Sequence, residues 1–273
     1  MSKLGGATTF AAEASLWIAG AAIIAGAAGA HWNVKVPDVA SLMGATPSPS
    51  VAASASPSPT AAIRTLAPGA SPTMSPLAAK YQTYVARADY QFKAKYTSSQ
   101  TLTVAGKPME IDISGTMGYL NGNHFDHSRV TSDGAVETDD TIALDGFSYE
   151  SIDSQPWTKT DRPAADLAND RLLFAPVAIF IDGGVETKNG LRLHRLDIAD
   201  PVAFSKAALK VSTGGATDAQ FTYTVWVDDN GVPADIKLDG WVQEPINGVS
   251  TKVTTSEEFR IIATSGVSIS API

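Results

Sequence analysis

FTYTVWVDDNGVPADIKLDGWV, residues 221–242, is the stretch that decides the fold class. In its first part the apolar Phe221, Tyr223 and Val225 alternate with polar threonines. A period of two is typical of a strand with one buried face, because successive side chains point to opposite sides. The Asp-Asp-Asn-Gly sequence at 228–231 favours a tight turn, since Asn and Gly tolerate positive φ. The alternation resumes over 232–242 and again over 249–262, so this part of the chain predicts three long antiparallel strands.

Several of these features resemble one family. FTYTVWVD at 221–228, the Asp-Asn-Gly turn, the long return strand and the closing VSISAPI at 267–273 resemble the C-terminal half of the LppX/LprAFG-like lipoproteins. Those proteins belong to the LolA-like superfamily of lipid carriers, and the likeness extends more loosely back to about Ala88. The resemblance implies a half-barrel sheet wrapped over helices, with an apolar cavity between them that takes acyl chains. The chain has no cysteine, so it departs from the lipidated Cys of that family, and an apolar helix would have to replace the lipid anchor.

The rest of the folded region shows the same alternation, interrupted by helical periodicity. Strands are predicted over residues 90–96, 109–119, 124–132, 135–144, 147–152 and 185–198. Helices are predicted over residues 77–88, 163–181 and 200–210, the second of them kinked or divided by Pro176. The predicted fold class is α+β: a curved antiparallel half-barrel sheet packed on inserted helices, preceded by an N-terminal hydrophobic helix and a disordered linker.

The N-terminal region divides into two segments of different composition. Residues 14–30 carry no charge and reach the short limit for a membrane-spanning helix. They fit either a cleaved signal peptide, with Lys3 and a small-residue site at 28–30, or a retained anchor with Trp17 and Trp32 near the membrane interfaces. We favour the anchor narrowly, and both readings export the rest of the chain. Residues 34–76, rich in Pro, Ser and Ala, predict a disordered linker, and residues 77–273 predict the lipid-binding domain.

Charge and motif content exclude several classes of function. The net charge of −8 disfavours binding to nucleic acid, because an acidic surface repels phosphate backbones. His124 and His127 lie three apart in a predicted strand and therefore point to opposite faces, so they do not share a metal. The acidic turn at 228–231 lacks the ligand spacing of a calcium loop. No nucleophile–base arrangement or cofactor motif is present, so we predict no catalytic residues, no metal and no cofactor.

The apolar residues are the remaining candidates for a binding site. Pattern alone favours an ordinary packed core between sheet and helices, whereas the family resemblance favours a space left open for lipid. The strand candidates are Tyr90, Phe92, Ile111, Ile113, Phe221, Tyr223 and Val225. The helix candidates are Leu172, Leu173, Val177 and Phe180.

Two functions follow from these two readings of the interior. The first is an extracytoplasmic, membrane-tethered binding protein that holds a lipid or other amphiphile, for lipid transport or cell-envelope maintenance. Its membrane contact would be the N-terminal helix, or it would be secreted if that segment is cleaved. The alternative is a sensory or scaffolding domain of the cell envelope with a packed interior and no ligand.

Overall fold

The computed structural model describes residues 74–104, 107–132, 134–162, 171, 173–176, 178–211, 215–246 and 249–272. The predicted export segment, nearly all of the linker, most of the predicted helix 163–181, and the candidates Leu172 and Val177 lie outside these residues. Among the described helices, none is both long and apolar enough to cross a membrane.

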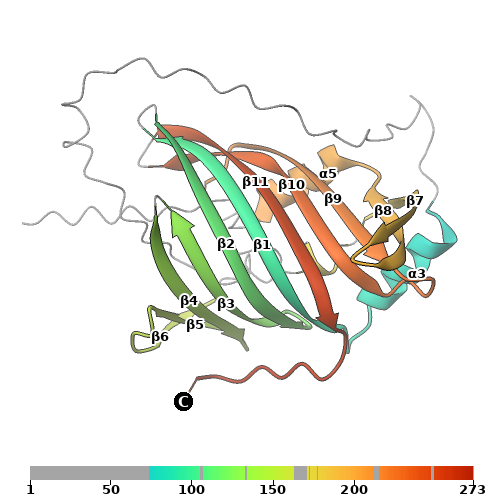
Figure 1. Cartoon of the computed structure of the whole chain (residues 1–273), viewed down its shortest axis with the longest axis horizontal. Helices are drawn as coiled ribbons and strands as arrows, with labels where there is room; N and C mark the ends of the chain where they lie inside the picture. Colours follow the sequence, from blue (N-terminus) through green and yellow to red (C-terminus); the bar gives the residue numbers. More distant parts are fainter. Residues whose placement is uncertain are drawn as a thin grey trace, which may run out of the picture.

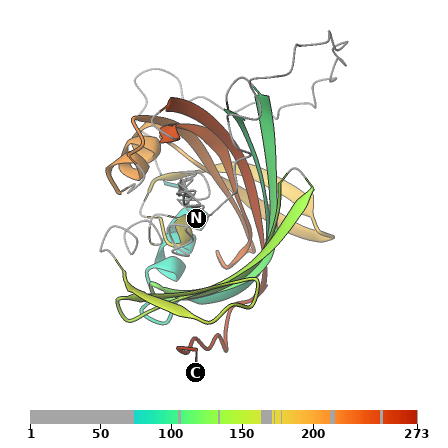
Figure 2. The same ribbon diagram turned by 90° about the vertical axis from the view of Figure 1, so that its left-hand side faces the viewer.

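One antiparallel sheet of 11 strands makes up most of the described structure. Its order is β6-β5-β4-β3-β2-β1-β11-β10-β9-β8-β7, so each strand lies beside its neighbour in sequence except where β1 meets β11. The strands are β1 (Gln91–Val104), β2 (Lys107–Leu120), β3 (Asn123–Ser132), β4 (Ala135–Leu144), β5 (Phe147–Ile152), β6 (Thr158–Asp161), β7 (Phe180–Lys188), β8 (Leu191–Ile198), β9 (Asp218–Val227), β10 (Pro233–Ile246) and β11 (Val249–Ala263). Figures 1 and 2 show the sheet curving strongly, so that it has a concave and a convex face.

Alternating side chains give the two faces different chemistry. In β1, Phe92, Ala94 and Tyr96 are buried, while Lys93 and Lys95 between them are exposed. The register continues this division across the sheet, because Tyr96 pairs with Phe259 of β11 and with Gly115 of β2. The buried set lies on the concave face, which we call the inner face.

Two described helices lie on the concave side of the sheet (Figure 2). Helix α3 (Pro76–Val85) begins at Ser75, whose side chain accepts a hydrogen bond of 3.1 Å from the amide of Ala78. Helix α5 (Pro201–Val211) begins after Asp200, whose carboxylate accepts from the amide of Ala203 at 2.9 Å. Both helices thus have an oxygen-bearing side chain at the N-cap and a proline at the first helical position, two features that are common at helix N-termini. Helix α5 packs on β9, and α3 lies beside β7.

The turn predicted at 228–231 is present and fixes α3 as well as the strands. Asp228 Oδ1 accepts hydrogen bonds from the amides of Asn230 (2.8 Å) and Val232 (2.9 Å). Gly231 has φ +80°, and a Cβ there would lie 2.7 Å from the amide nitrogen of Tyr81 in α3. The turn therefore needs glycine both for its backbone conformation and for contact with the helix.

The structure corrects the prediction between residues 163 and 198. The predicted helix does not extend to 181: Phe180 begins strand β7, after Pro176, which lacks the amide a continuing helix needs. The single strand predicted over 185–198 is two strands, β7 and β8, because Asn189 and Gly190 adopt positive φ (51° and 78°) and reverse the chain. Strand β6, which the sequence pattern did not indicate, adds one exposed edge to the sheet.

Candidate functional site

The inner face changes character along β1 and its neighbours. Starting from Phe92 and moving toward Leu102, its inward positions are first aromatic, then polar, then aliphatic. Because every second residue of a strand faces inward, these zones follow directly from the sequence of β1, FKAKYTSSQTL at 92–102. Strand β11 repeats this order in register, whereas β2 places Ile113 and Ile111 opposite the polar Ser98 and Gln100 of β1.

The aromatic zone is tightly packed. The Phe174 ring lies at its centre. The centroid of this ring is 5.4 Å from that of Phe92, 5.2 Å from that of Tyr119 and 5.8 Å from that of Phe259. The Tyr90 hydroxyl donates to the carbonyl oxygen of Phe174 at 2.8 Å. Such spacings are those of favourable aromatic pairs in direct contact. This zone is therefore a filled core.

A second group of rings continues the core toward the helices. Tyr81 of α3 meets Phe180 edge to face at 5.3 Å, and its hydroxyl lies 3.4 Å from that of Tyr223. Phe204 of α5 lies 5.8 Å from the Tyr223 ring. These contacts hold both helices against the inner face of β9.

The polar zone lies between the aromatic and the aliphatic zones. It consists of Ser98 and Gln100 of β1 with Thr255 and Glu257 of β11, which pair as Ser98 with Glu257 and Gln100 with Thr255. Glu257 Oε1 accepts hydrogen bonds from Ser98 (3.4 Å) and Thr255 (3.1 Å). Burial raises the pKa of Glu257 well above its usual range, and the two hydroxyls lower it only in part. The carboxyl of Glu257 is therefore much harder to ionise than that of an exposed glutamate.

The aliphatic zone lies beside and beyond the polar zone on four neighbouring strands, β2, β1, β11 and β10. Its buried members are Leu102, Met109, Ile111, Val242, Ile246 and Val253. Among the described elements, the helices make their main contacts with β9 and β7 rather than with the strands that carry this zone. The zone is thus a part of the inner face where no described helix makes its main contacts.

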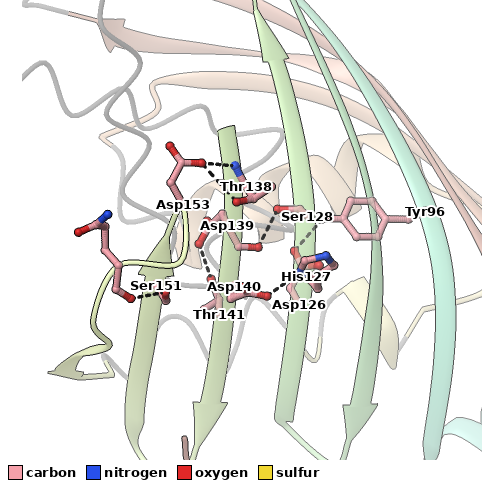
Figure 3. Close-up of polar contacts among 11 residues, drawn as sticks. Tyr96, Asp126, His127, Ser128, Thr138, Asp139, Asp140, Thr141, Ser151 and Asp153 are labelled. Atoms are coloured by element: carbon pink, nitrogen blue, oxygen red, sulfur yellow. Dashed lines mark hydrogen bonds and ion pairs between the residues drawn. The ribbon is translucent and has the colours of Figure 1, made fainter. Parts of the chain in front are cut away.

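A polar arrangement on β3 and β4 extends the inner face toward the other edge (Figure 3). Tyr96 donates a hydrogen bond of 2.7 Å to Asp126 Oδ2, and Asp139 lies one strand further on, where Ser128 donates to its carbonyl oxygen at 3.4 Å. Burial raises the pKa of Asp126 to about 7, although the Tyr96 hydrogen bond lowers it. Burial, followed by repulsion from Glu150 and Asp126, raises the pKa of Asp139 to about 8.

A separate hollow of about 540 Å³ lies on the opposite, convex face. It is lined by residues of β1, β2, β3 and β11, among them Thr97, Ser99, Asp112, Arg129 and Glu258. Ser99 donates to Asp112 at 2.9 Å, so part of this polarity is satisfied internally. Its lining mixes hydroxyls and charged groups with the apolar Ile113, so it is less suited to an acyl chain than a wholly apolar cavity.

The candidate residues described by the structure all lie inside. These are Tyr90, Phe92, Ile111, Ile113, Leu173, Phe180, Phe221, Tyr223 and Val225. They do not form one site, however. Tyr90, Phe92, Phe180 and Tyr223 belong to the filled aromatic core, whereas Ile111 belongs to the aliphatic zone.

Sequence reasoning missed the inward polar residues Gln100, Asp126, Asp139 and Glu257. A signal was present for Gln100 and Glu257, because the flanking inward positions of their strands hold Leu102 and Phe259. Strands β3 and β4 gave no such signal, since polar residues such as His124 and Thr141 share the inward positions of Asp126 and Asp139. Two of the missed residues stand in adjacent acidic pairs, Asp139-Asp140 and Glu257-Glu258. In each pair the first carboxyl is buried and only the second faces outward.

Comparison with family models and with curated protein sequences gives no match. Among solved structures, the chain is similar to LprF from Mycobacterium bovis (12% identity, 74% of this chain and 99% of that one, TM-score 0.36). It is also similar to the lipoprotein LppX from Mycobacterium tuberculosis (12%, 71% and 98%, 0.38). A third is a putative outer membrane lipoprotein-sorting protein domain from Vibrio parahaemolyticus (12%, 70% and 92%, 0.26). At these values the likeness is weak, and only the chemistry of the inner face can indicate function.

Proposed function

We propose that this protein is an extracytoplasmic binding protein, tethered to a membrane by its N-terminal segment, that holds a lipid or other amphiphile against the inner face of its sheet. Lipid transport or maintenance of the cell envelope is the role that this activity would serve. Binding, and not catalysis, is its task in this proposal.

The aliphatic zone is the observation that carries the proposal. Leu102, Val242 and Val253 are buried apolar side chains at neighbouring inward positions of long strands, and Ile111 lies beside them on β2. Glu244 is the buried polar neighbour of Val242 on β10, and no described helix makes its main contacts with this zone. Removing an acyl chain from water contributes about 0.8 kcal/mol per CH₂. A chain of ordinary length could therefore bind tightly to such a surface without a single charged contact.

The alternative function is a sensory or scaffolding domain with a packed interior. The aromatic zone favours it, because the rings around Phe174 already fill that end of the inner face. The two functions differ in what contacts the aliphatic zone. In the binding protein a lipid contacts it, whereas in the scaffold only protein side chains do.

Mass spectrometry of solvent extracts from the purified whole protein tests the proposal. We expect a co-purified lipid in stoichiometric amount, and displacement of a fluorescent fatty-acid probe by that lipid. A protein that yields no lipid and binds no probe would instead have the packed-scaffold function.

A further inference from the structure

Two side chains in the polar zone are buried without a full set of hydrogen bonds. Gln100 has no exposed surface, and neither its Oε1 nor its Nε2 has a partner in the part of the chain that the structure describes. Glu257 is 1% exposed, and its Oε2 likewise has no partner among the described residues. Buried polar groups in folded proteins almost always have partners, because an unpaired one loses its hydration without replacement. These atoms therefore indicate a partner that is not part of the sheet.

The position of this pair relates it to the ligand of the proposed function. Gln100 and Glu257 face inward on adjacent strands, one inward position apart in register. The filled aromatic core begins on one side of them at Tyr96 and Phe259, and the aliphatic zone begins on the other at Leu102 and Val253. An amphiphile whose chain lies on the aliphatic zone would thus end with its polar group at this pair.

The charges of the inward side chains determine which polar group of a bound amphiphile can lie beside Gln100 and Glu257. No Lys or Arg stands at an inward position of β1, of β2 from Met109 on, or of β3, β4, β9, β10 and β11. The buried inward charges of these strands are carboxyls, at Asp126, Asp139, Glu244 and Glu257. An anionic headgroup would meet no Lys or Arg at these described inward positions and would be repelled by any of these carboxyls that is ionised.

The hydrogen-bonding groups of Gln100 and Glu257 instead suit an uncharged partner. Burial raises the pKa of Glu257, which favours the protonated carboxyl, and in that form the group can donate a hydrogen bond as well as accept one. The Gln100 amide offers both a donor and an acceptor. A hydroxyl or an ester carbonyl can satisfy such a pair, and neither brings a charge into the interior.

We propose that Gln100 and Glu257 form a subsite for an uncharged oxygen-bearing group of the bound amphiphile, a hydroxyl or an ester carbonyl, and that the protein therefore selects neutral lipids over anionic ones. This inference rests on the proposed function and names the ligand class of that same site.

Competition binding with three probes of matched chain length tests the subsite: monooleoylglycerol (neutral), oleate (anionic) and oleylamine (cationic). The whole protein, freed of lipid, is compared with Gln100→Leu, Glu257→Leu and the isosteric Glu257→Gln. Thr101→Leu, on the exposed side of the same strand, is the matched control. We expect the wild-type protein to bind monooleoylglycerol about tenfold more tightly than oleate, the difference that one buried hydrogen-bonding partner supports.

The variants separate a ligand contact from a structural role. Gln100→Leu and Glu257→Leu should remove the preference for monooleoylglycerol, whereas Glu257→Gln and Thr101→Leu should keep it. In the lipid-free protein, Gln100→Leu should raise the urea midpoint, because it removes an unpaired buried amide. A lowered midpoint would show that Gln100 serves the fold and would overturn the subsite.

Three binding results would also overturn it, each in a distinct way. Equal affinity for monooleoylglycerol and oleate, unchanged in Gln100→Leu, would leave the proposed function standing and show that water satisfies the pair. Tighter binding of oleylamine would show a cation site. Failure of the wild-type protein to bind any probe would remove the proposed function together with the subsite.

Discussion

Tyr96 on β1 reaches over Gly115 of β2 to donate a hydrogen bond of 2.7 Å to Asp126 on β3, two strands away. Gly115 makes this possible because it has no side chain on the inner face. A Cβ at that position would lie 2.7 Å from the Tyr96 ring and 2.6 Å from the carbonyl oxygen of His127. The contact ties three strands together where the sheet curves.

Gly115→Ala should therefore destabilise the protein strongly. One of the two close contacts is backbone, which cannot move aside, so we expect a loss of about 1–3 kcal/mol in the free energy of unfolding. Urea denaturation measures it. Ser114→Ala, at the exposed neighbouring position, should change stability by less than about 0.5 kcal/mol. An equal effect of the two substitutions would contradict the close packing of Tyr96 over Gly115.

Asp126 should make the protein less stable as the pH rises. Its pKa is raised to about 7 in the folded state, against about 3.9 for an unfolded aspartate. Between these values the folded state binds the proton and the unfolded state has lost it, so the free energy of unfolding falls with increasing pH and levels off above the folded pKa. Asp139, with its pKa raised to about 8, acts in the same direction.

Asp126→Asn should weaken this pH dependence. The amide oxygen can still accept from Tyr96, while the ionisation is gone, so we expect a smaller fall in the urea midpoint between pH 5 and 8 and a higher midpoint than wild type at pH 8. Asp112→Asn, on the convex face, should leave the profile unchanged. A variant as pH-sensitive as the wild-type protein would show that Asp126 is not the titrating group.

Gly231 and Gly146 offer a matched pair of turn glycines. Both have positive φ (+80° and +84°), but a Cβ at 231 would lie 2.7 Å from the Tyr81 amide nitrogen, whereas one at 146 would meet nothing within 4 Å. Gly146→Ala should cost about 1 kcal/mol from backbone strain alone. Gly231→Ala should cost at least 1 kcal/mol more by displacing α3, and thermal unfolding of both variants measures the difference. Equal losses would mean that α3 does not pack against this turn.

Enlarging side chains should distinguish the filled core from the aliphatic zone. Ala94→Leu adds volume beside Phe92 and Tyr96, where packing is complete, and should cost about 1–3 kcal/mol. Ile111→Phe, in the aliphatic zone, should cost less than about 1 kcal/mol while weakening binding of a fluorescent fatty acid severalfold. Equal destabilisation by both, with probe binding unaffected, would favour the packed-scaffold function.

Much of the fold was predictable because strand alternation is a local signal. The strands predicted on either side of Asn121-Gly122 and of Asp145-Gly146 are present and pair as hairpins, since each turn has the positive φ that these residues tolerate. The same signal at Asn189-Gly190 was overlooked inside one predicted strand. The helix predicted over 163–181 does not include Phe180, which begins strand β7. A short apolar run such as the one around Phe180 fits a buried strand as well as a helix.

The sequence by itself determined the antiparallel class, the strand boundaries near the turns and the inward direction of residues such as Phe92 and Tyr223. These depend on near-neighbour chemistry: a period of two and turn residues that tolerate positive φ. Only the tertiary structure decided that β1 pairs with β11, and so that Gln100 and Glu257 share one zone of the inner face. That pairing joins segments far apart in the chain, and burial of a carboxyl depends on everything packed around it, which no local pattern records.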